Sequence, residues 1–226
     1  MCFAPEADAA VGVFVVAVGV DALRHVDAPR EIPLAALPLL FGLHQLSEAF
    51  VWWGLQGHVA HEVERVGVWT YVAFALIALP AYLPLAVGLA EHSATRRRVI
   101  AGFGVLGFAV AATLAVSVVR GTISTMIDGR HVEYAVDAVG HGGPITTLYV
   151  IATCGALLAS SYRDIAVIGA LNLVVTPLLM VLTVGGFVSL WCFWAAMVSV
   201  LIDVHFRRQR AGRQARAQPE GIRRAG

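Results

Sequence analysis

Lysine is absent from this 226-residue chain, and all sixteen basic residues are arginines. A lysine Schiff base, which seven-helix retinal proteins and many covalent enzymes require, is therefore excluded. The net charge is only +1, so nothing predicts a nucleic-acid partner. The three cysteines form no CxxC or zinc-ribbon spacing, and there is no glycine-rich nucleotide-binding loop. We expect neither a cofactor nor a metal centre.

Hydrophobic residues make up 58% of the chain and charged residues only 14%, and the apolar residues are gathered into long uncharged runs. A helix that crosses a membrane needs about 20 such residues. The sequence therefore predicts an all-α, polytopic protein of the cell membrane with seven transmembrane helices, at residues 9–26, 32–56, 68–90, 98–119, 144–162, 165–184 and 186–205.

Arginines are unevenly divided between the two sides of such a bundle. With the N-terminus outside, thirteen fall in inner segments and three, Arg65, Arg120 and Arg130, in outer segments. This distribution predicts an external N-terminus and a cytoplasmic C-terminus. Residues 1–206 form the transmembrane domain. The Arg-rich residues 207–226 lack apolar periodicity and are expected to be a disordered cytoplasmic extension, attracted to anionic membrane lipids.

Four polar residues interrupt the second run: His44, Gln45, Ser47 and Glu48. At 1.5 Å per residue, Glu48 lies about 24 Å from the start of the run, in the outer half of the membrane. His44 lies one turn deeper, and the i, i+4 spacing places both residues on one helix face. An ionisable group at this depth is costly unless it has a partner or holds a proton.

This cluster leaves three interpretations open. Glu48 and His44 form a structural pair that is hydrogen-bonded to Asn172 or to a carbonyl of the fourth helix. Alternatively, Glu48 is a protonated acid that donates a proton or contacts a ligand, with Gln45 in the same pocket. The third interpretation is a solvated position.

Aromatic residues collect toward the predicted outer side. Trp52 and Trp53 end the second helix, and Trp191 begins the seventh with Trp194 close behind. They form an interfacial aromatic belt or the wall of a ligand pocket, because aromatic rings serve both purposes.

The longest loop, residues 120–143, is predicted to be external. His131, Tyr134 and His141 follow helical spacing, so we expect a helical segment that lies across the outer mouth as a lid. His58 and His61 come from the neighbouring outer loop, and four histidines on one side could bind a metal. No HxxxH or HExxH spacing is present, so solvated histidines are the expected state.

Further residues have simpler expected roles. Cys2 and Cys192 fall on the outer side, where they either form a disulfide or remain free thiols. Cys154 is expected to be a small buried hydrophobe. Asp203 is expected to pair with Arg207 at i, i+4 spacing.

Prolines and glycines predict local features of the bundle. Pro80 and Pro84 should kink the third helix, because each lacks an N–H group. Gly102, Gly104 and Gly107 should let the fourth helix approach a neighbour closely.

Several segments resemble an uncharacterised bacterial family of multi-pass membrane proteins whose members begin Met-Cys-Phe-Ser. The similarity is carried by Met1-Cys-Phe-Ala, Pro38-Leu-Leu-Phe-Gly with Gln45 and Glu48, the His131 and Tyr134 pair, and Ser189-Leu-Trp-Cys-Phe-Trp-Ala. Ala4 stands where the family has Ser, and His44 where Gln is expected. This family implies the architecture but no activity.

The chain also resembles, more loosely, the seven-helix membrane terpene cyclases, which use acids in helices two and seven. Glu48 and Asp203 fall in the matching helices, and this resemblance implies Glu48 as the acid that protonates an isoprenoid, with His44 and Tyr134 as positioning groups. Because the helices alternate in direction, Glu48 and Asp203 should nevertheless lie at opposite membrane faces. The partners expected are membrane lipid and a lipophilic small molecule. The alternative hypothesis is a non-catalytic transporter, sensor or assembly partner that uses Glu48 to bind a ligand or a proton.

Overall fold

The protein is described here by a computed structural model that places residues 4–128, 131–136, 143–182 and 187–224, with the side chains at 128, 131, 179–182, 187–193 and 216–224 left out of the description. The described chain is mostly helical and forms seven successive helical segments, two of which are interrupted. The elements are α1 (Pro5–Arg24), η1 (Pro29–Glu31), α2 (Ile32–Ala35), α3 (Leu37–Leu55), α4 (His61–Val72), η2 (Ala73–Ala78), α5 (Leu79–Ala90), α6 (Ala94–Arg120), β1 (Ile123–Asp128), β2 (His131–Val136), α7 (Pro144–Leu158), α8 (Arg163–Leu182) and α9 (Phe187–Arg224).

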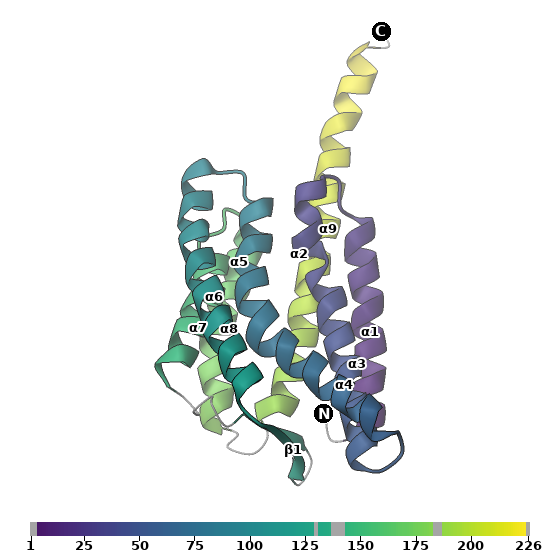
Figure 1. The fold of residues 1–226 in the computed structure, drawn as a ribbon. Helices are drawn as coiled ribbons and strands as arrows, with labels where there is room; N and C mark the ends of the chain where they lie inside the picture. Colours follow the sequence, from purple (N-terminus) through teal and green to yellow (C-terminus); the bar gives the residue numbers. More distant parts are fainter. Residues whose placement is uncertain (1–3, 129–130, 137–142, 183–186, 225–226) are drawn as a thin grey trace.

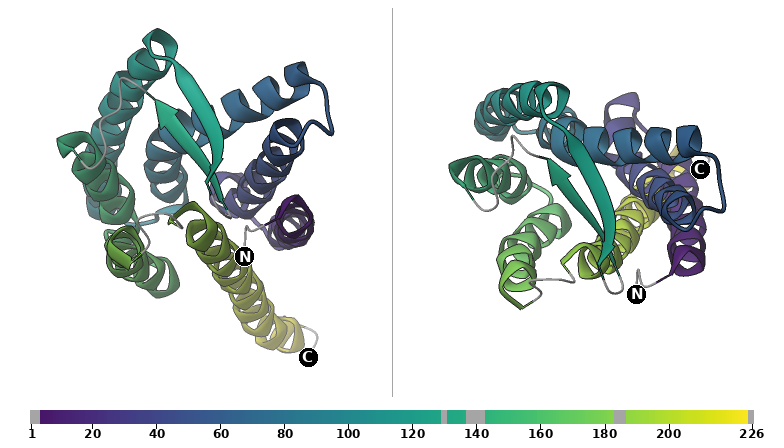
Figure 2. Two further views of the ribbon diagram at one scale, coloured as in Figure 1. Left: turned by 90° about the horizontal axis from the view of Figure 1, so that it is seen from below. Right: turned by 60° about the horizontal axis from the view of Figure 1, so that its bottom comes forward.

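Each predicted apolar run coincides with one helical segment. Successive segments pack side by side, and α9 closes the arrangement by packing against α8, α1 and α3 (Figure 1). Figure 2 shows the helices in a ring, with the β1–β2 hairpin lying across the lower end. The core divides into two clusters, one toward each end of the bundle. Leu34, Ile168 and Phe206 belong to the first, and Trp52 and Val118 to the second.

The third helical segment, in which Pro80 and Pro84 predict a kink, is not a regular α-helix throughout. It passes through η2, a stretch of π-helix that ends at Ala78, two residues before Pro80. A Cβ atom at Gly107 of α6 would lie 2.0 Å from the carbonyl oxygen of Pro80, so the predicted close approach occurs at this glycine. A Cβ at Gly102 would meet no atom within 4 Å.

The predicted helical lid is wrong, because residues 131–136 form strand β2, which pairs antiparallel with β1. Val132, Tyr134 and Val136 alternate along the strand, and alternate residues of a strand face the same side. Val132 is fully buried and Val136 nearly so, and both belong to the core cluster that contains Trp52. The loop therefore covers this end of the bundle as a hairpin.

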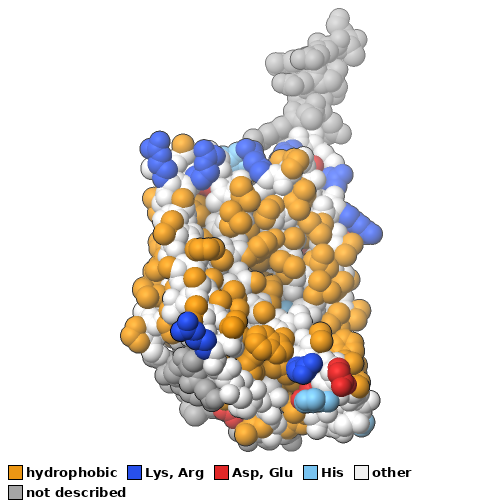
Figure 3. Space-filling view, viewed as in Figure 1, with side chains coloured by type: hydrophobic (Ala, Val, Ile, Leu, Met, Phe, Trp, Pro, Cys, Tyr) orange, Lys and Arg blue, Asp and Glu red, His pale blue; other side chains and the backbone are white. Residues whose placement is uncertain are grey.

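Large apolar side chains cover much of the molecular surface. Figure 3 shows them over the middle of one face, with arginines gathered toward one end and a few near the other. Val105, Phe108 and Val119 of α6 are between 69% and 74% exposed. In the described chain three helical segments are long and apolar enough to cross a membrane: Pro29–Leu55, His61–Ala90 and Ala94–Arg120. A soluble monomer seldom exposes an apolar surface of this extent.

The C-terminal segment differs from the disordered extension predicted for residues 207–226, because α9 continues as a helix to Arg224. The predicted pair of Asp203 and Arg207 is confirmed, with Nε and Oδ2 2.7 Å apart. Arg213 of the same helix lies 2.6 Å from Glu31 and 3.0 Å from Asp27. These ion pairs hold α9 against the turn between α1 and α2.

Candidate functional site

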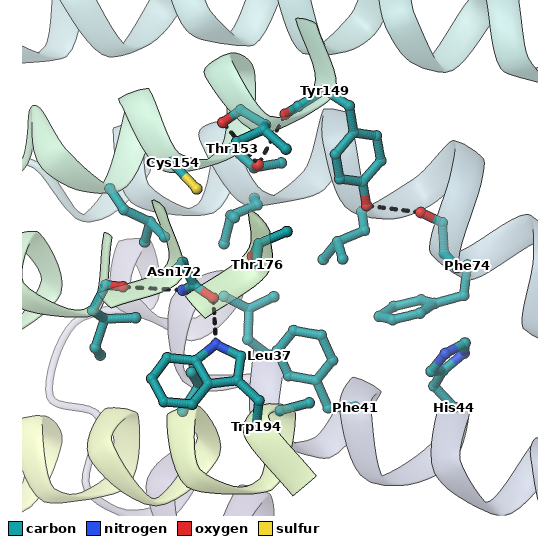
Figure 4. Close-up of a pocket in the computed structure, with 18 of the residues that line it drawn as sticks. Leu37, Phe41, His44, Phe74, Tyr149, Thr153, Cys154, Asn172, Thr176 and Trp194 are labelled. Atoms are coloured by element: carbon teal, nitrogen blue, oxygen red, sulfur yellow. Dashed lines mark hydrogen bonds between the residues drawn. The ribbon is translucent and has the colours of Figure 1, made fainter. Parts of the chain in front are cut away.

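A cavity of about 270 Å³ lies inside the helical ring, between α3, α5, α7, α8 and α9 (Figure 4). Its wall is mainly aliphatic and aromatic, and includes Leu37, Phe41, Phe74, Leu83, Ile168 and Val198. The side chains in the wall that carry a hydrogen-bonding group are His44, Tyr71, Thr146, Tyr149, Thr153, Asn172, Thr176 and Trp194. Among the described lining residues none is acidic and none is arginine. The cavity therefore favours an uncharged, apolar occupant.

Several of the wall's polar groups form hydrogen bonds within the protein itself. The Tyr149 hydroxyl donates to the carbonyl of Ala75, 2.8 Å away, and Thr153 donates to the carbonyl of Tyr149 at 2.9 Å. Across the cavity, Trp194 Nε1 donates to Asn172 Oδ1 at 2.7 Å (Figure 4). The Asn172 amide donates in turn to the carbonyl of Ile168 at 3.1 Å. These bonds fix the wall and satisfy groups that would be costly to bury alone.

His44 is the exception among the described lining residues. Its side chain is 9% exposed, and its Nδ1 is buried with no hydrogen bond to a described residue. The ring stacks on Tyr71, with centroids 4.1 Å apart, and lies 4.8 Å from Phe74. The predicted partner Asn172 accepts a hydrogen bond from Trp194 instead.

The stack continues from His44 to the hairpin. Tyr134 of β2 lies nearly parallel to Tyr71, with ring centroids 4.3 Å apart. The structure thus joins the predicted site residues His44 and Tyr134 through Tyr71, which the sequence analysis did not single out. The sequence signal that could have identified Tyr71 is its polar hydroxyl group within the apolar run 68–90.

Glu48 lies one turn beyond the end of the cavity. The residues of α3 that line the cavity are Leu37, Phe41 and His44, and Glu48 is not among them. Glu48 is only 1% exposed, in a part of α3 that packs against α1. One turn earlier, Gln45 donates a 2.7 Å hydrogen bond to Oδ1 of Asp8, which is fully buried. The predicted first apolar run begins at residue 9, so Asp8 fell outside it and this contact was not predicted.

Asp203 lies far from Glu48, as the antiparallel order of the helices predicts. Asp203 offers a ligand atom within 4.8 Å of those of Asp21 and His25 near the end of α1. Asp8 accepts the hydrogen bond from Gln45, which lies one turn from Glu48. Asp8 is thirteen residues before Asp21 on α1, or about 20 Å along the helix axis. Arg207 lies 2.7 Å from both Asp21 and Asp203 and offsets their charge. The structure therefore does not bring the predicted acids into one site.

The remaining predicted pocket residues do not line the cavity where they are described. Trp52 is buried in the second core cluster, and Trp53 stacks edge-on against Phe50. The side chains of His131, Trp191 and Cys192, and all of Cys2, lie outside the described residues, and with them the predicted disulfide. Cys154 is buried in the cavity wall as a free thiol. Of the described outer histidines, neither His58 nor His61 joins a group able to hold a metal.

A family model matches residues 1–217 of the chain, and its description reads Family of unknown function (DUF6629). No curated protein and no solved structure matches the chain.

Proposed function

The chain belongs to this family, and we propose that it is a multi-pass integral membrane protein that binds a lipophilic small molecule in the cavity of its helical ring. The N-terminus lies outside the cell membrane and the C-terminus in the cytoplasm. The observation that carries the proposal is the cavity itself, an uncharged space of about 270 Å³ within a surface of exposed apolar side chains.

The size and chemistry of the cavity support this assignment. A dry apolar cavity of about 150 Å³ is large enough to bind benzene, so this cavity has room for a larger lipophile. The aromatic rings of Phe41, Phe74 and Trp194 give it a polarisable wall. A molecule dissolved in the bilayer could reach such a site without first entering water.

A second candidate is an enzyme that protonates and cyclises an isoprenoid, and the burial of Glu48 favours it. Glu48 lies about 6 Å farther along α3 than His44, which is one helical turn. The acid would need to reach past the end of the cavity, whereas binding needs no such movement. Turnover of polyprenyl or epoxy-polyprenyl substrates by the wild type, and its loss in Glu48→Gln, would support the enzyme over the binding protein.

A cavity-filling substitution tests the binding proposal. Ala195 of α9 lines the cavity, so Ala195→Phe places a ring in the space that the ligand would occupy. The matched control is Ala112→Phe on the exposed face of α6. Each protein is placed in lipid nanodiscs, and retained decan-1-ol is measured against empty nanodiscs. We expect Ala195→Phe to retain at least about fivefold less decan-1-ol than the wild type, which corresponds to about 1 kcal/mol of binding free energy. Ala112→Phe should retain as much as the wild type.

Two outcomes would overturn the proposal. The first is a wild-type protein that retains no more decan-1-ol than empty nanodiscs. The second is equal retention by the wild type and Ala195→Phe, which would place the bound molecules elsewhere on the protein.

A further inference from the structure

His44 differs from several other polar groups of the cavity wall. Its Nδ1 is buried without a hydrogen bond to a described residue, whereas Tyr149, Thr153 and the Asn172 oxygen already have partners. The ring lines the cavity with the small part of its surface that stays accessible. A ligand that bonds to this part of the ring would bind better than a plain hydrocarbon, which can form no such bond.

The ring is held in place by its neighbours rather than by polar bonds. Tyr71 covers one face at a centroid distance of 4.1 Å, and Phe74 lies against it at 4.8 Å. Figure 4 shows His44 and Phe74 together at one side of the cavity, opposite Asn172 and Trp194. Because stacking fixes the plane of the ring, the part of the ring that lines the cavity keeps a constant position.

The setting of the ring also limits the charge of the ligand. The described cavity wall contains no acidic residue and no arginine. A charged imidazole, or a carboxylate or ammonium group on the ligand, would be buried without a counter-ion, which is strongly unfavourable. Both partners are therefore neutral.

Resting on the proposed function, we infer that His44 is the hydrogen-bonding anchor of the cavity and that the ligand is a neutral lipophile bearing a hydroxyl group. A neutral imidazole has one N–H donor and one acceptor nitrogen. A hydroxyl group both donates and accepts, so it can bond to either nitrogen, whereas a carbonyl group can only accept.

The position of His44 also orients the ligand. His44 is the last residue of α3 in the cavity wall, and the wall extends along the same segment back to Leu34. Ten residues of helix span about 15 Å. The hydroxyl group thus lies at the end of the cavity nearest the hairpin, and the apolar tail extends toward Leu34, Leu83 and Ile202.

The test compares decan-1-ol with decane, which lacks only the hydroxyl group. Wild type, His44→Phe and His44→Gln are placed in lipid nanodiscs, and retention of each probe is measured relative to empty nanodiscs. We expect the wild type to prefer the alcohol, and His44→Phe to reduce that preference about three- to tenfold, the value of one hydrogen bond. His44→Phe keeps an aromatic ring for stacking, so its retention of decane should be unchanged.

His44→Gln supplies the control for a merely structural role. Its amide can donate and accept, so the alcohol preference should be largely restored. An alcohol preference in His44→Phe equal to that of the wild type would overturn the anchor while leaving the cavity as the binding site. If the wild type retains neither probe, the cavity fails as the binding site and the anchor fails with it.

Discussion

Glu91 is a buried carboxylate between α5 and α6, and its hydrogen bonds join two turns of the bundle. Its oxygens accept bonds from the Ser161 N–H and hydroxyl groups at 2.6 Å, and from the Ser93 N–H group at 2.8 Å. Burial alone would raise the pKa of Glu91, but these bonds from Ser161 and Ser93 outweigh it and lower the pKa below its usual 4.5. The ionised carboxylate therefore stabilises the folded protein.

The sign of this shift predicts an acid-dependent loss of stability. The pKa of Glu91 is lower in the folded protein than in the unfolded chain. The ionised carboxylate therefore contributes its full stability above about pH 4.5, and this stability is lost as the pH falls through the pKa of the folded protein. Glu91→Gln should cost about 1.5–3 kcal/mol at neutral pH and should flatten the decline in acid. Melting temperatures in detergent between neutral and acidic pH measure both effects. The exposed Glu62→Gln is the matched control, and a Glu91→Gln profile parallel to that of the wild type would contradict the prediction.

His44 and Glu48 show how far residue-level prediction extends. The sequence singled out both, because polar residues in an apolar run are conspicuous. It could not determine which of them reaches the cavity, since that depends on where Tyr71, Phe74 and the hairpin close the space. These neighbours come from distant parts of the chain. Asp8 was missed for the same reason, because its burial depends on Gln45, which is thirty-seven residues away.

At the scale of the element, the contact between α5 and α6 depends on Gly107, which has no side chain. A Cβ at Gly107 would lie 2.0 Å from the Pro80 oxygen and 3.0 Å from its carbonyl carbon, and both are backbone atoms. Gly107→Ala must therefore push the helices apart, and overpacking of this kind costs about 1–3 kcal/mol or more. Thermal unfolding of the purified protein measures the loss.

Gly102→Ala is the control on the same helix. A Cβ there meets nothing within 4 Å, and alanine favours a helix over glycine by about 1 kcal/mol. This variant should be as stable as the wild type or slightly more so. Equal stability of the two alanine variants would show that the close approach at Gly107 contributes nothing.

The elements that the sequence predicted well are those encoded locally. Each long apolar run became a helix, because the run itself carries the signal. The hairpin was mispredicted, because His131, Tyr134 and His141 match helical spacing while Val132, Tyr134 and Val136 match strand alternation equally well. Burial of the two valines against the bundle decides between these patterns, and burial is not visible in a short segment.

At the scale of the whole molecule, arginines and their partners bind the turns at one end to each other. Arg30 contacts His92, Arg96 donates to the carbonyl of Ser160 at 2.9 Å, and Arg213 reaches Glu31. The helical extension of α9 takes part through Arg213, whose pKa is raised by its hydrogen bond to Glu31. Contacts of this kind join residues more than sixty positions apart, so the sequence alone indicated a free tail.

This end of the molecule should face the cytoplasm, and reporter fusions test the orientation. The turn containing Gly57, between α3 and α4, belongs to the opposite end, whereas Ser161 between α7 and α8 lies beside Arg96 and Glu91. Because positive residues are retained inside, alkaline phosphatase inserted after Gly57 should be active. Green fluorescent protein fused after Ser161 or after Gly226 should fluoresce in a bacterial host. The reverse pattern would invert the orientation, and the same compartment for Gly57 and Gly226 would rule out seven crossings.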